Sequence, residues 1–397
     1  MNPIALVTCY FQPNYGSQLQ AYATQLVFDK LGVANETICI DGLQGEINKS
    51  KYKYFLSRIT DINTVKDKFA TVKKVVAEKV ASDEHKQNMA TRRAMFRDFS
   101  QTKFNISKLY NSKAELGAQA HNYSAFVVGS DQLWLPSNIS ADYYTLNFVP
   151  EDVPKIALST SFGVSALPKK QAKLAGEFLK RLDHCSVRED SGQRLIKELS
   201  GRDVPVVCDP TILFTAEEWA KVIPQSRFYE EKYLFCYFLG NNPEQREFVK
   251  RVKEATGYRI VQLQHCDEYI KSDVGFPDLT PYNVGPAEFV QLIRDAEYVF
   301  TDSFHSSVFS LLNHKKFFTF RRYNNDGIVS TNGRLYSLLS LVGQSDRLLR
   351  GDENVDDELK KSVDYSVVDE KLASLRKFTF EYIKEALTQS GIAYDNY

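Results

Sequence analysis

The sequence predicts an α/β protein with two Rossmann-like domains, each built on a parallel sheet, facing one another across a cleft. Short apolar, β-branched runs alternate with helical patterns in two successive series, which is typical of parallel sheets covered by helices. At 397 residues the chain is also longer than one hydrophobic core usually fills. The Asp209-Pro210 turn separates the two series, so we expect domains at 1–209 and 210–345. A helical tail, 346–397, should pack back on the first domain.

The first domain is predicted to begin with a strand, because residues 4–10 form a continuous apolar run. A helical pattern follows and closes at Leu31-Gly32. A strand at 36–40 completes a strand–helix–strand unit whose crossover should be right-handed. The alternation then resumes after an interruption, with strands predicted at 125–128, 155–160, 184–187 and 204–208 and helices at 169–182 and 191–199.

The interruption, at about 44–113, is a basic insertion with long helical patterns. Between Lys49 and Lys103, fourteen lysines and arginines stand against six acidic residues, a local balance of +8. One interpretation is a solvated helical face. The other is a peripheral contact with anionic lipid at the inner membrane face, through a helix that sets apolar residues beside lysines. Those apolar residues are Val65, Phe69, Val72, Val76 and Val80.

The second domain follows a hinge region at about 209–222 and repeats the alternation. Because the carboxyl ends of parallel strands share one edge of a sheet, ligands of open α/β sheets bind at that edge. The predicted strands lie at 233–239, 259–263, 298–301 and 316–320, and the predicted helices at 243–256, 286–296, 306–313 and 335–341.

Composition narrows the class of protein. Lysine plus arginine equals aspartate plus glutamate, at 50 each, so the overall charge gives no argument for a nucleic-acid partner. The six cysteines show no C-x-x-C pair and no metal-like spacing with the histidines, so we expect reduced thiols and no metal. The first residues lack a basic signal-peptide region, and no apolar run approaches the roughly 18 residues of a membrane span. These features predict a cytoplasmic protein.

The break between strand 298–301 and the helix after it is the strongest candidate site. Residues 302–307 are expected to form the turn, with His305 inside it. A helix N-terminus offers unpaired amides and partial positive charge, which suit a phosphate or carboxylate. The hydroxyls of Ser303, Ser306 and Ser307 can cap the helix or donate to such an anion. A buried histidine or an inert cap is the alternative interpretation.

Arginines are expected on the same edge. Arg321 and Arg322 leave the strand at 316–320, and Asn332 and Arg334 follow in the next loop. Guanidinium groups bind phosphate or carboxylate through two parallel hydrogen bonds. Each arginine could equally be an ordinary surface residue. In the first domain, Arg188 occupies a similar strand-to-helix junction, where a salt bridge to a neighbouring acid is equally plausible.

Two loops of the first domain carry further candidates. The segment 129–134 leaves a predicted strand, and Asp131 could act as a base or bind sugar hydroxyls while Trp134 stacks on a pyranose ring. The alternatives are a turn cap for Asp131 and a core position for Trp134. The loop Asn14-Tyr-Gly-Ser17 brings amides to a helix start, as phosphate loops do, but lacks both Walker and G-x-G-x-x-G spacing.

Several of these segments, in this order, resemble the polysaccharide pyruvyl transferase family over about residues 1–345. The resemblance implies a fold similar to that of the GT-B glycosyltransferases. It also implies transfer of pyruvate from phosphoenolpyruvate to a sugar hydroxyl pair as a ketal, in capsular or exopolysaccharide biosynthesis. The matching segments are Asn14-Tyr-Gly-Ser-Gln-Leu-Gln-Ala-Tyr-Ala-Thr24, Val128-Gly-Ser-Asp-Gln-Leu-Trp134, Ser186-Val-Arg-Glu-Asp190, Cys208-Asp-Pro-Thr211, Gly285-Pro-Ala-Glu-Phe289, Thr301-Asp-Ser-Phe-His-Ser-Ser307 and Asn332-Gly-Arg-Leu-Tyr-Ser-Leu-Leu339.

The resemblance also implies roles for residues. His305 matches the family's functional histidine, and we expect it to be the general acid/base with Asp131 near the acceptor hydroxyls. Many members carry an arginine where this chain has Ser303; Arg321, Arg322 or Arg334 could supply that charge. The residues expected to bind the donor are Arg188, Arg321, Arg334, Ser303 and Ser306. Those expected to bind the acceptor are Asn14, Gly16, Ser17, Gln132, Trp134 and Asn332.

The expected partners are therefore phosphoenolpyruvate, as a co-substrate, and a sugar or lipid-linked oligosaccharide acceptor, with no cofactor and no metal. Two alternatives stay open. One is a glycosyltransferase that uses a nucleotide-sugar donor on the same scaffold. The other is a carbohydrate-binding member without turnover, because the family's charge is missing at Ser303.

Overall fold

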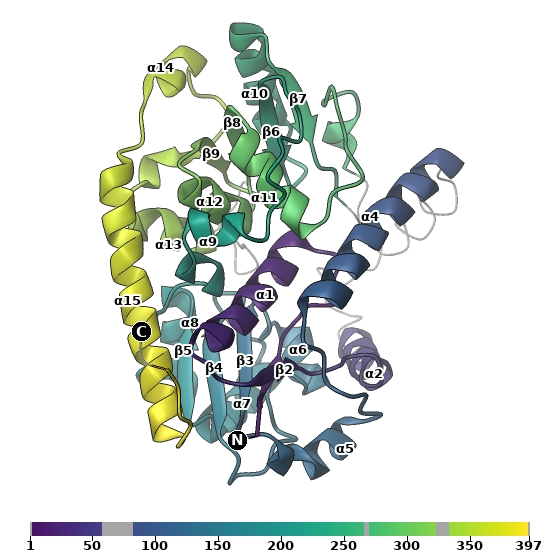
Figure 1. Cartoon of the computed structure of the whole chain (residues 1–397), viewed down its shortest axis with the longest axis vertical. Coiled ribbons are helices and arrows are strands. Elements are labelled where there is room, and N and C mark those ends of the chain that lie inside the picture. Colours follow the sequence, from purple (N-terminus) through teal and green to yellow (C-terminus); the bar gives the residue numbers. More distant parts are fainter. Residues whose placement is uncertain (1, 58–81, 266–269, 323–332, 396–397) are drawn as a thin grey trace.

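The computed structural model describes residues 2–57, 82–265, 270–322 and 333–395. Two parallel five-stranded sheets lie one above the other, each flanked by helices (Figure 1). This confirms the predicted α/β fold with two parallel-sheet domains. In sheet order, the first domain has β2 (Asn35–Thr37), β1 (Ile4–Val7), β3 (Ala125–Asp131), β4 (Lys155–Thr160) and β5 (His184–Val187). The second has β10 (Leu348–Leu349), β9 (Lys316–Phe320), β8 (Tyr298–Thr301), β6 (Tyr233–Tyr237) and β7 (Arg259–Gln262).

Helices connect these strands and cover them. The first-domain helices are α1 (Tyr15–Lys30), α2 (Gln44–Leu56), α4 (Asp83–Lys103), α5 (Lys113–Ala118), α6 (Pro136–Ala141), α7 (Lys169–Arg181) and α8 (Asp190–Ser200). The second domain and the tail contain α9 (Ala216–Ala220), α10 (Pro243–Thr256), α11 (Pro286–Asp295), α12 (Phe304–Leu312), α13 (Gly333–Leu341), α14 (Val355–Lys360) and α15 (Tyr365–Gln389).

The strands read as apolar runs because both faces of each sheet are covered. All four residues of β1 and all five of β6 are buried. One hydrophobic cluster begins at the first sheet and continues into the second domain through Trp219, Phe289 and Phe309. Tyr15, at the start of α1, stacks on Phe289 with ring centroids 4.6 Å apart. The two domains are therefore joined by core packing as well as by the chain.

Several boundaries differ from the sequence-based prediction, and three of these differences are instructive. Strand β10 belongs to the second sheet although it lies beyond residue 345. The strand predicted at 204–208 is reduced to a single bridge between Val206 and Val187, next to Pro205, which has no N–H for a ladder. Helix α12 begins at Phe304 rather than Ser306, because the Ser303 side chain already caps it, so the turn is shorter than predicted.

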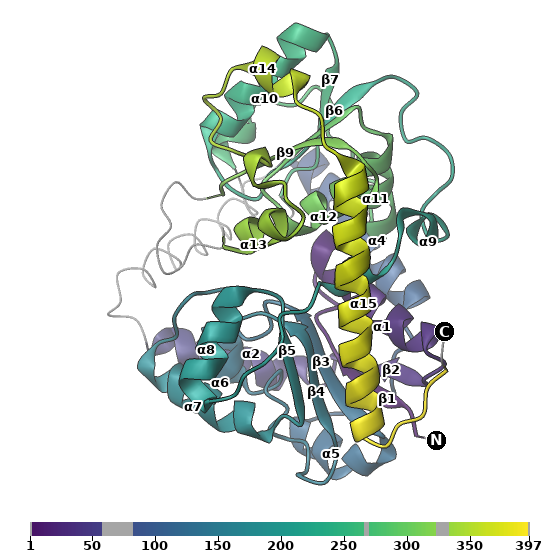
Figure 2. The same cartoon turned by 90° about the vertical axis from the view of Figure 1, so that its left-hand side faces the viewer.

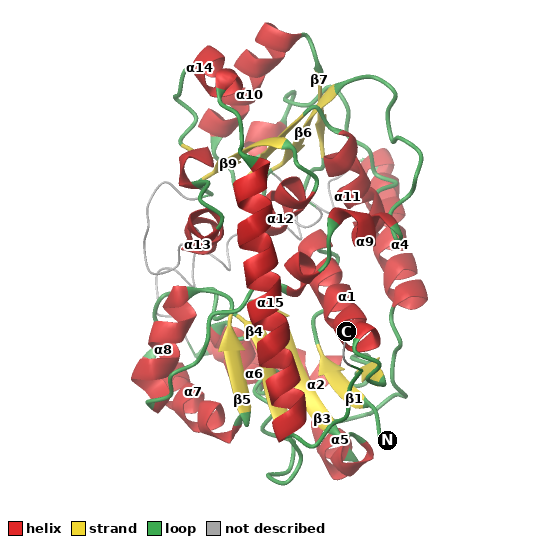
Figure 3. Ribbon diagram, turned by 60° about the vertical axis from the view of Figure 1, so that its left-hand side comes forward, coloured by secondary structure: helices red, strands yellow, loops and turns green. Residues whose placement is uncertain are grey.

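Helix α15, yellow in Figure 2, runs along both domains. Its first residue, Tyr365, hydrogen-bonds the backbone oxygen of Lys315 in the second domain. Further along, the Tyr382 hydroxyl donates to the Ala157 oxygen on β4 at 2.9 Å. Figure 3 shows this helix passing in front of the first sheet on its way between the two halves. The tail thus packs on the first domain and also ties it to the second.

The basic insertion is described only in part. Helix α4 reaches the second domain, where buried Arg92 donates to the backbone oxygens of Gln264 and Pro281, both at 2.6 Å. The predicted apolar helix with Val65 and Val80 lies outside the described residues. Within the described part of the chain, no helix combines the length and the hydropathy needed to cross a membrane.

Candidate active site

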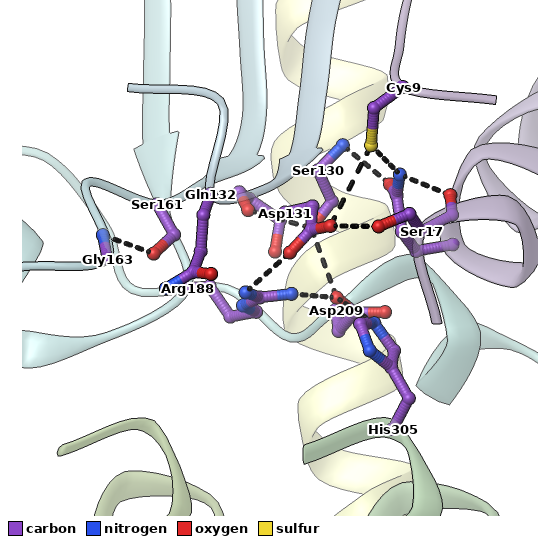
Figure 4. A network of polar contacts seen from close by, with 12 residues as sticks. Cys9, Ser17, Ser130, Asp131, Gln132, Ser161, Gly163, Arg188, Asp209 and His305 are labelled. Carbon is purple, nitrogen blue, oxygen red and sulfur yellow. Dashed lines mark hydrogen bonds and ion pairs between the residues drawn. The ribbon is translucent and has the colours of Figure 1, made fainter. Parts of the chain in front are cut away.

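The carboxyl ends of the two sheets meet at one polar network, which Figure 4 shows from close by. Ser17 follows β1 on helix α1, Asp131 ends β3, Arg188 follows β5, and His305 follows β8. In the first sheet, β1 and β3 are neighbours whose connections leave in opposite directions. Open α/β sheets bind ligands at such a switch point. Side chains that the sequence placed far apart are thus brought together at a ligand-binding position of the fold.

His305 lies in the first turn of α12 and is 6% exposed. Its Nε2 atom is 3.6 Å from Oδ2 of Asp209, close enough for an ion pair when the imidazole is protonated. The other face of the ring rests on helix α1: a Cβ added to Gly16 would lie 2.0 Å from the imidazole Nδ1. Gly16 is therefore required for the close approach of α1 to His305.

Asp209 is fully buried in the segment that joins the two domains. Its Oδ1 accepts hydrogen bonds from the Thr211 amide at 3.0 Å and the Thr211 hydroxyl at 2.7 Å. Its Oδ2 accepts from Arg188 Nη1 at 2.5 Å and from the Ser130 hydroxyl at 3.1 Å. Burial opposes ionisation, but His305 and Arg188 together hold the pKa of Asp209 well below its usual range. Asp209 is therefore a buried anion that contacts both domains.

Arg188 stands at the centre of the network, with a side chain that is 2% exposed. Besides Asp209, it lies 3.5 Å from Asp131 and 3.8 Å from Glu189, and its guanidinium stacks 4.5 Å from the ring centroid of Phe304. Burial disfavours its charge, but the three carboxylates raise its pKa above the ordinary value. Its Nε and Nη2 atoms make no hydrogen bond within the described residues. Both atoms are buried and face carboxylates at longer distances, Nη2 towards Asp131 and Nε towards Glu189.

Asp131 is the most accessible carboxylate of the network, with 15% of its side chain exposed. Its Oδ2 accepts a hydrogen bond from the Ser17 hydroxyl at 2.7 Å. Burial by itself would raise its pKa, but the positive charges of Arg188, His305 and Arg334 lower it. Its backbone lies in the left-handed region, with φ at 72°, which aspartate tolerates better than most residues. Asp131 is therefore an ionised group beside the imidazole.

The second domain contributes two more cations. The Arg322 Nη2 atom donates to the backbone oxygen of Asp302 at 3.1 Å. Arg334, on α13, makes no hydrogen bond or ion pair with any described carboxylate, and its Nε atom is buried. Burial, together with the charges of Arg188 and Arg322, lowers the pKa of Arg334 to about 10. Arg321 instead stacks 5.6 Å from the ring centroid of Tyr336.

Several residues predicted to bind ligands serve the fold instead. Ser303 caps α12, and Ser306 is fully buried, so the donor-binding role predicted for Ser306 has no exposed atom. Trp134 is also fully buried, and its indole donates to the Tyr144 oxygen at 3.0 Å, so the prediction of a stacking surface for sugar is wrong. Its place in the core, among Phe162 and Phe178, is decided by packing that no local pattern shows.

The remaining residues predicted to bind the acceptor differ in whether their polar groups are already hydrogen-bonded. The Asn14 side chain accepts from the Ser17 amide at 3.1 Å, so this amide of the loop is already satisfied and is not free for a phosphate. Gln132 is partly exposed, and its buried Nε2 atom lacks a hydrogen-bond partner within the described residues. Ser17 and Gly16 contact the network directly. Asn332 lies outside the described residues.

The sequence analysis missed Asp209, Glu189 and Cys9 as members of this network, in which the Cys9 thiol donates to Oδ2 of Asp131 at 3.7 Å. Asp209 had a signal, because Asp-Pro stands in a segment shared with the resembled family, yet the pair also fits an ordinary turn. Across the described residues, no group of three histidine, cysteine or acidic side chains is arranged to hold a metal ion. What the network offers is cationic groups, an imidazole and ionised carboxylates, which suit anion binding and proton transfer.

Comparisons with known proteins show the family and the fold. Residues 14–324 match the family model described as polysaccharide pyruvyl transferase. No curated protein matches the chain. Among solved structures, a UDP-N-acetylglucosamine 2-epimerase is similar with a TM-score of 0.52 and 8% identity, covering 98% of this chain and 96% of that one. The glycosyltransferase SnogD from Streptomyces nogalater has a TM-score of 0.42 and 9% identity, covering 99% and 100%. The first of these similarities concerns the fold alone.

Proposed function

Because the chain belongs to the polysaccharide pyruvyl transferase family, we propose that it transfers pyruvate from phosphoenolpyruvate to two hydroxyl groups of one sugar, forming a ketal. Phosphoenolpyruvate carries a phosphate and a carboxylate on three carbons. Such a donor requires several cations close together and a group that delivers a proton to carbon. The network at the two sheet edges contains both.

The observation that carries the proposal is the buried guanidinium of Arg334, which lies among other arginines. Its pKa is lowered by burial and by two neighbouring arginines, Arg188 and Arg322, and the charges of Asp131 and Glu189 offset this only in part. Gathering like charges in this way costs free energy unless an anion binds among them. A donor with two anionic groups would supply the missing negative charge. Arg322, bonded to the backbone beside Ser303, is the best candidate for the charge that the family more often carries there.

The reaction requires two carbon–oxygen bonds to form and one to break. His305 would protonate the methylene carbon of the donor while a sugar hydroxyl attacks the central carbon and loses its proton to Asp131. Phosphate then leaves with the bridging oxygen, and the second hydroxyl closes the ring and gives its proton to the departing phosphate. The atoms balance as phosphoenolpyruvate plus diol giving ketal plus phosphate. Arg188 and Arg334 would stabilise the charge on the donor throughout.

The acceptor would be a sugar or a lipid-linked oligosaccharide, in capsular or exopolysaccharide biosynthesis. This setting implies a cytoplasmic protein that acts at the inner membrane face. One described feature supports a peripheral contact there: Tyr52, Phe55 and Leu56 are exposed on the last turns of α2, next to Lys53. Exposed aromatic and basic side chains of this kind favour the membrane interface. Loss of vesicle binding in 0.5 M salt, or in Lys53→Glu, is expected if the contact exists.

The test is proton NMR of methyl hexopyranosides incubated with the protein and phosphoenolpyruvate. A new ketal methyl singlet together with released phosphate is the expected result. His305→Ala should remove both signals, with a rate loss of at least about 10²-fold. His314→Ala is the matched control, because His314 pairs with Asp369 on the surface and should not matter. Thermal stabilisation by UDP but not by phosphoenolpyruvate would instead favour a nucleotide-sugar glycosyltransferase, and stabilisation by neither donor would favour a carbohydrate-binding member.

A further inference from the structure

We infer that Asp209 is a positioning residue, which orients His305 for proton transfer and holds it in register with Arg188 across the domain boundary. This inference rests on the proposed function for its chemistry but not for its geometry. Asp209 touches neither the donor nor the acceptor in this scheme. It would act through the two residues that do.

The geometry separates the two oxygens of the carboxylate. Both hydrogen bonds to Oδ1 come from Thr211, two residues further along the chain, and these fix the plane of the group. That leaves Oδ2 to face Arg188 at 2.5 Å from one domain and His305 at 3.6 Å from the other. Figure 4 shows Asp209 between these two side chains. One oriented oxygen therefore sets the relative position of a cation and an imidazole.

Proton transfer by His305 would explain why a buried carboxylate lies next to its ring. An imidazole that delivers a proton to carbon must first be protonated, and a carboxylate within about 4–6 Å favours the charged ring. A hydrogen-bonded or ion-paired carboxylate also selects the ring orientation, as in other acid/base pairs. Among the described residues, the carboxylates of Asp209 and Asp131 interact with the charge of His305, and the Arg188 guanidinium pairs with both. Of the two carboxylates, Asp209 is fully buried, so solvent screens its charge least.

A purely structural role for Asp209 does not account for its contact with His305. A buried carboxylate that only stabilises the linker would be satisfied by Thr211, Ser130 and Arg188, all from the first domain or the linker itself. Nothing in that role requires a histidine from the second domain at 3.6 Å. The two roles separate in turnover, because a residue that only stabilises the linker leaves kcat of a folded variant unchanged, whereas a positioning residue lowers it.

The first experiment is a proton NMR titration of the His305 ring in the full chain, wild type and Asp209→Asn, without any substrate. The expected result is a lower midpoint in the variant, because the protonated ring loses the carboxylate that lies 3.6 Å from its Nε2 atom. Ser130→Ala removes a hydrogen bond to the same oxygen but no charge, and its midpoint should match wild type. Equal midpoints in Asp209→Asn and wild type would overturn the inference.

The second experiment is kinetic. Asp209→Asn should lower kcat by about 10²- to 10⁴-fold, with the basic limb of the kcat profile moved to lower pH. If Asp209→Asn does not fold, Thr211→Val loosens the same carboxylate without removing it, and a smaller shift in the same direction is expected. An unshifted titration in that folded variant would also overturn the inference. The proposed function fails separately, when wild type releases no phosphate from phosphoenolpyruvate with any tested acceptor.

Discussion

Gly16→Ala is the sharpest probe of the site, because it adds one methyl group directly against the catalytic candidate. The new Cβ would lie 2.0 Å from Nδ1 of His305, whereas ordinary contact begins at 3.4 Å. The imidazole must therefore move by about 1.4 Å, or helix α1 must shift by as much. A misplacement of about 1 Å in a reacting group costs on the order of 10² in rate.

The cost in stability should not exceed the cost in rate, which is about 2.7 kcal/mol for a 10²-fold loss. Replacing glycine by alanine inside a helix is worth about 0.5–1 kcal/mol of stabilisation. Overpacking a buried contact costs about 1–3 kcal/mol. The two effects oppose each other, so we expect a folded protein that is destabilised by at most about 2.5 kcal/mol. Circular dichroism measures the unfolding midpoint, and phosphate release from phosphoenolpyruvate with methyl hexopyranosides measures the rate.

Gly45→Ala is the matched control. Gly45 is also the second residue of a helix, α2, but a Cβ there would meet nothing within 4 Å. This variant should gain about 0.5–1 kcal/mol of stability and keep full activity. If Gly16→Ala behaves in the same way, with a raised midpoint and wild-type turnover, then the packing of His305 on α1 does not matter and the reasoning is refuted.

Three further predictions concern charge and packing. Arg334→Gln should weaken phosphoenolpyruvate binding by about 10- to 100-fold, which is the value of one charged hydrogen bond. The free protein should be no less stable, because Arg188 and Arg322 then lose a neighbouring like charge. A thermal shift titration measures both effects, and an equal loss of affinity in Arg321→Gln would argue against a special role for Arg334. Trp134→Phe should lower the free energy of unfolding, measured in urea, by about 1–3 kcal/mol, because the buried Tyr144 oxygen loses its hydrogen-bond donor. A raised KM for the acceptor without that loss of stability would instead support the sugar-stacking role. Glu189→Gln should stabilise the protein at pH 8 more than at pH 4. Burial raises the pKa of Glu189 although Arg188 opposes this, so the folded state disfavours the ionised carboxyl. The contribution of Glu189 to stability is therefore present at low pH and declines as the pH rises through the folded-state pKa. Thermal unfolding at the two pH values measures this, and a variant that is less stable at pH 8 would contradict it.

Much of the fold follows from local patterns. The strands His184–Val187, Tyr298–Thr301 and Lys316–Phe320 are predicted to the residue, because a buried parallel strand is a short apolar run with clear ends. Helix α10 is likewise predicted over Pro243–Thr256, with proline at its start and Gly257 just after its end. Less local features were missed, such as the two-residue strand β10, whose pairing with β9 gives no signal of its own.

The same distinction, between local patterns and long-range packing, applies to the residues of the candidate site. His305, Asp131 and Arg188 were found because each follows a predicted strand, and the carboxyl ends of parallel strands converge. Trp134 was assigned wrongly for the same reason, since proximity to that edge does not reveal whether a side chain points outward or into the core. Ser303 illustrates a third case, in which one side chain could either cap a helix or bind an anion, and only the tertiary structure distinguishes these roles.

The sequence by itself determined the parallel α/β class, the two-domain division and the strand ends that bear reactive groups, because these depend on residues within a few positions of one another. The tertiary structure alone decided that Asp209 joins His305 to Arg188, that Gly16 lies against the imidazole, and that Arg334 has no described carboxylate partner. These relations join segments separated by many residues and by a domain boundary. They depend on how α1, the linker and α12 pack together, and side-chain periodicity carries no information about that packing.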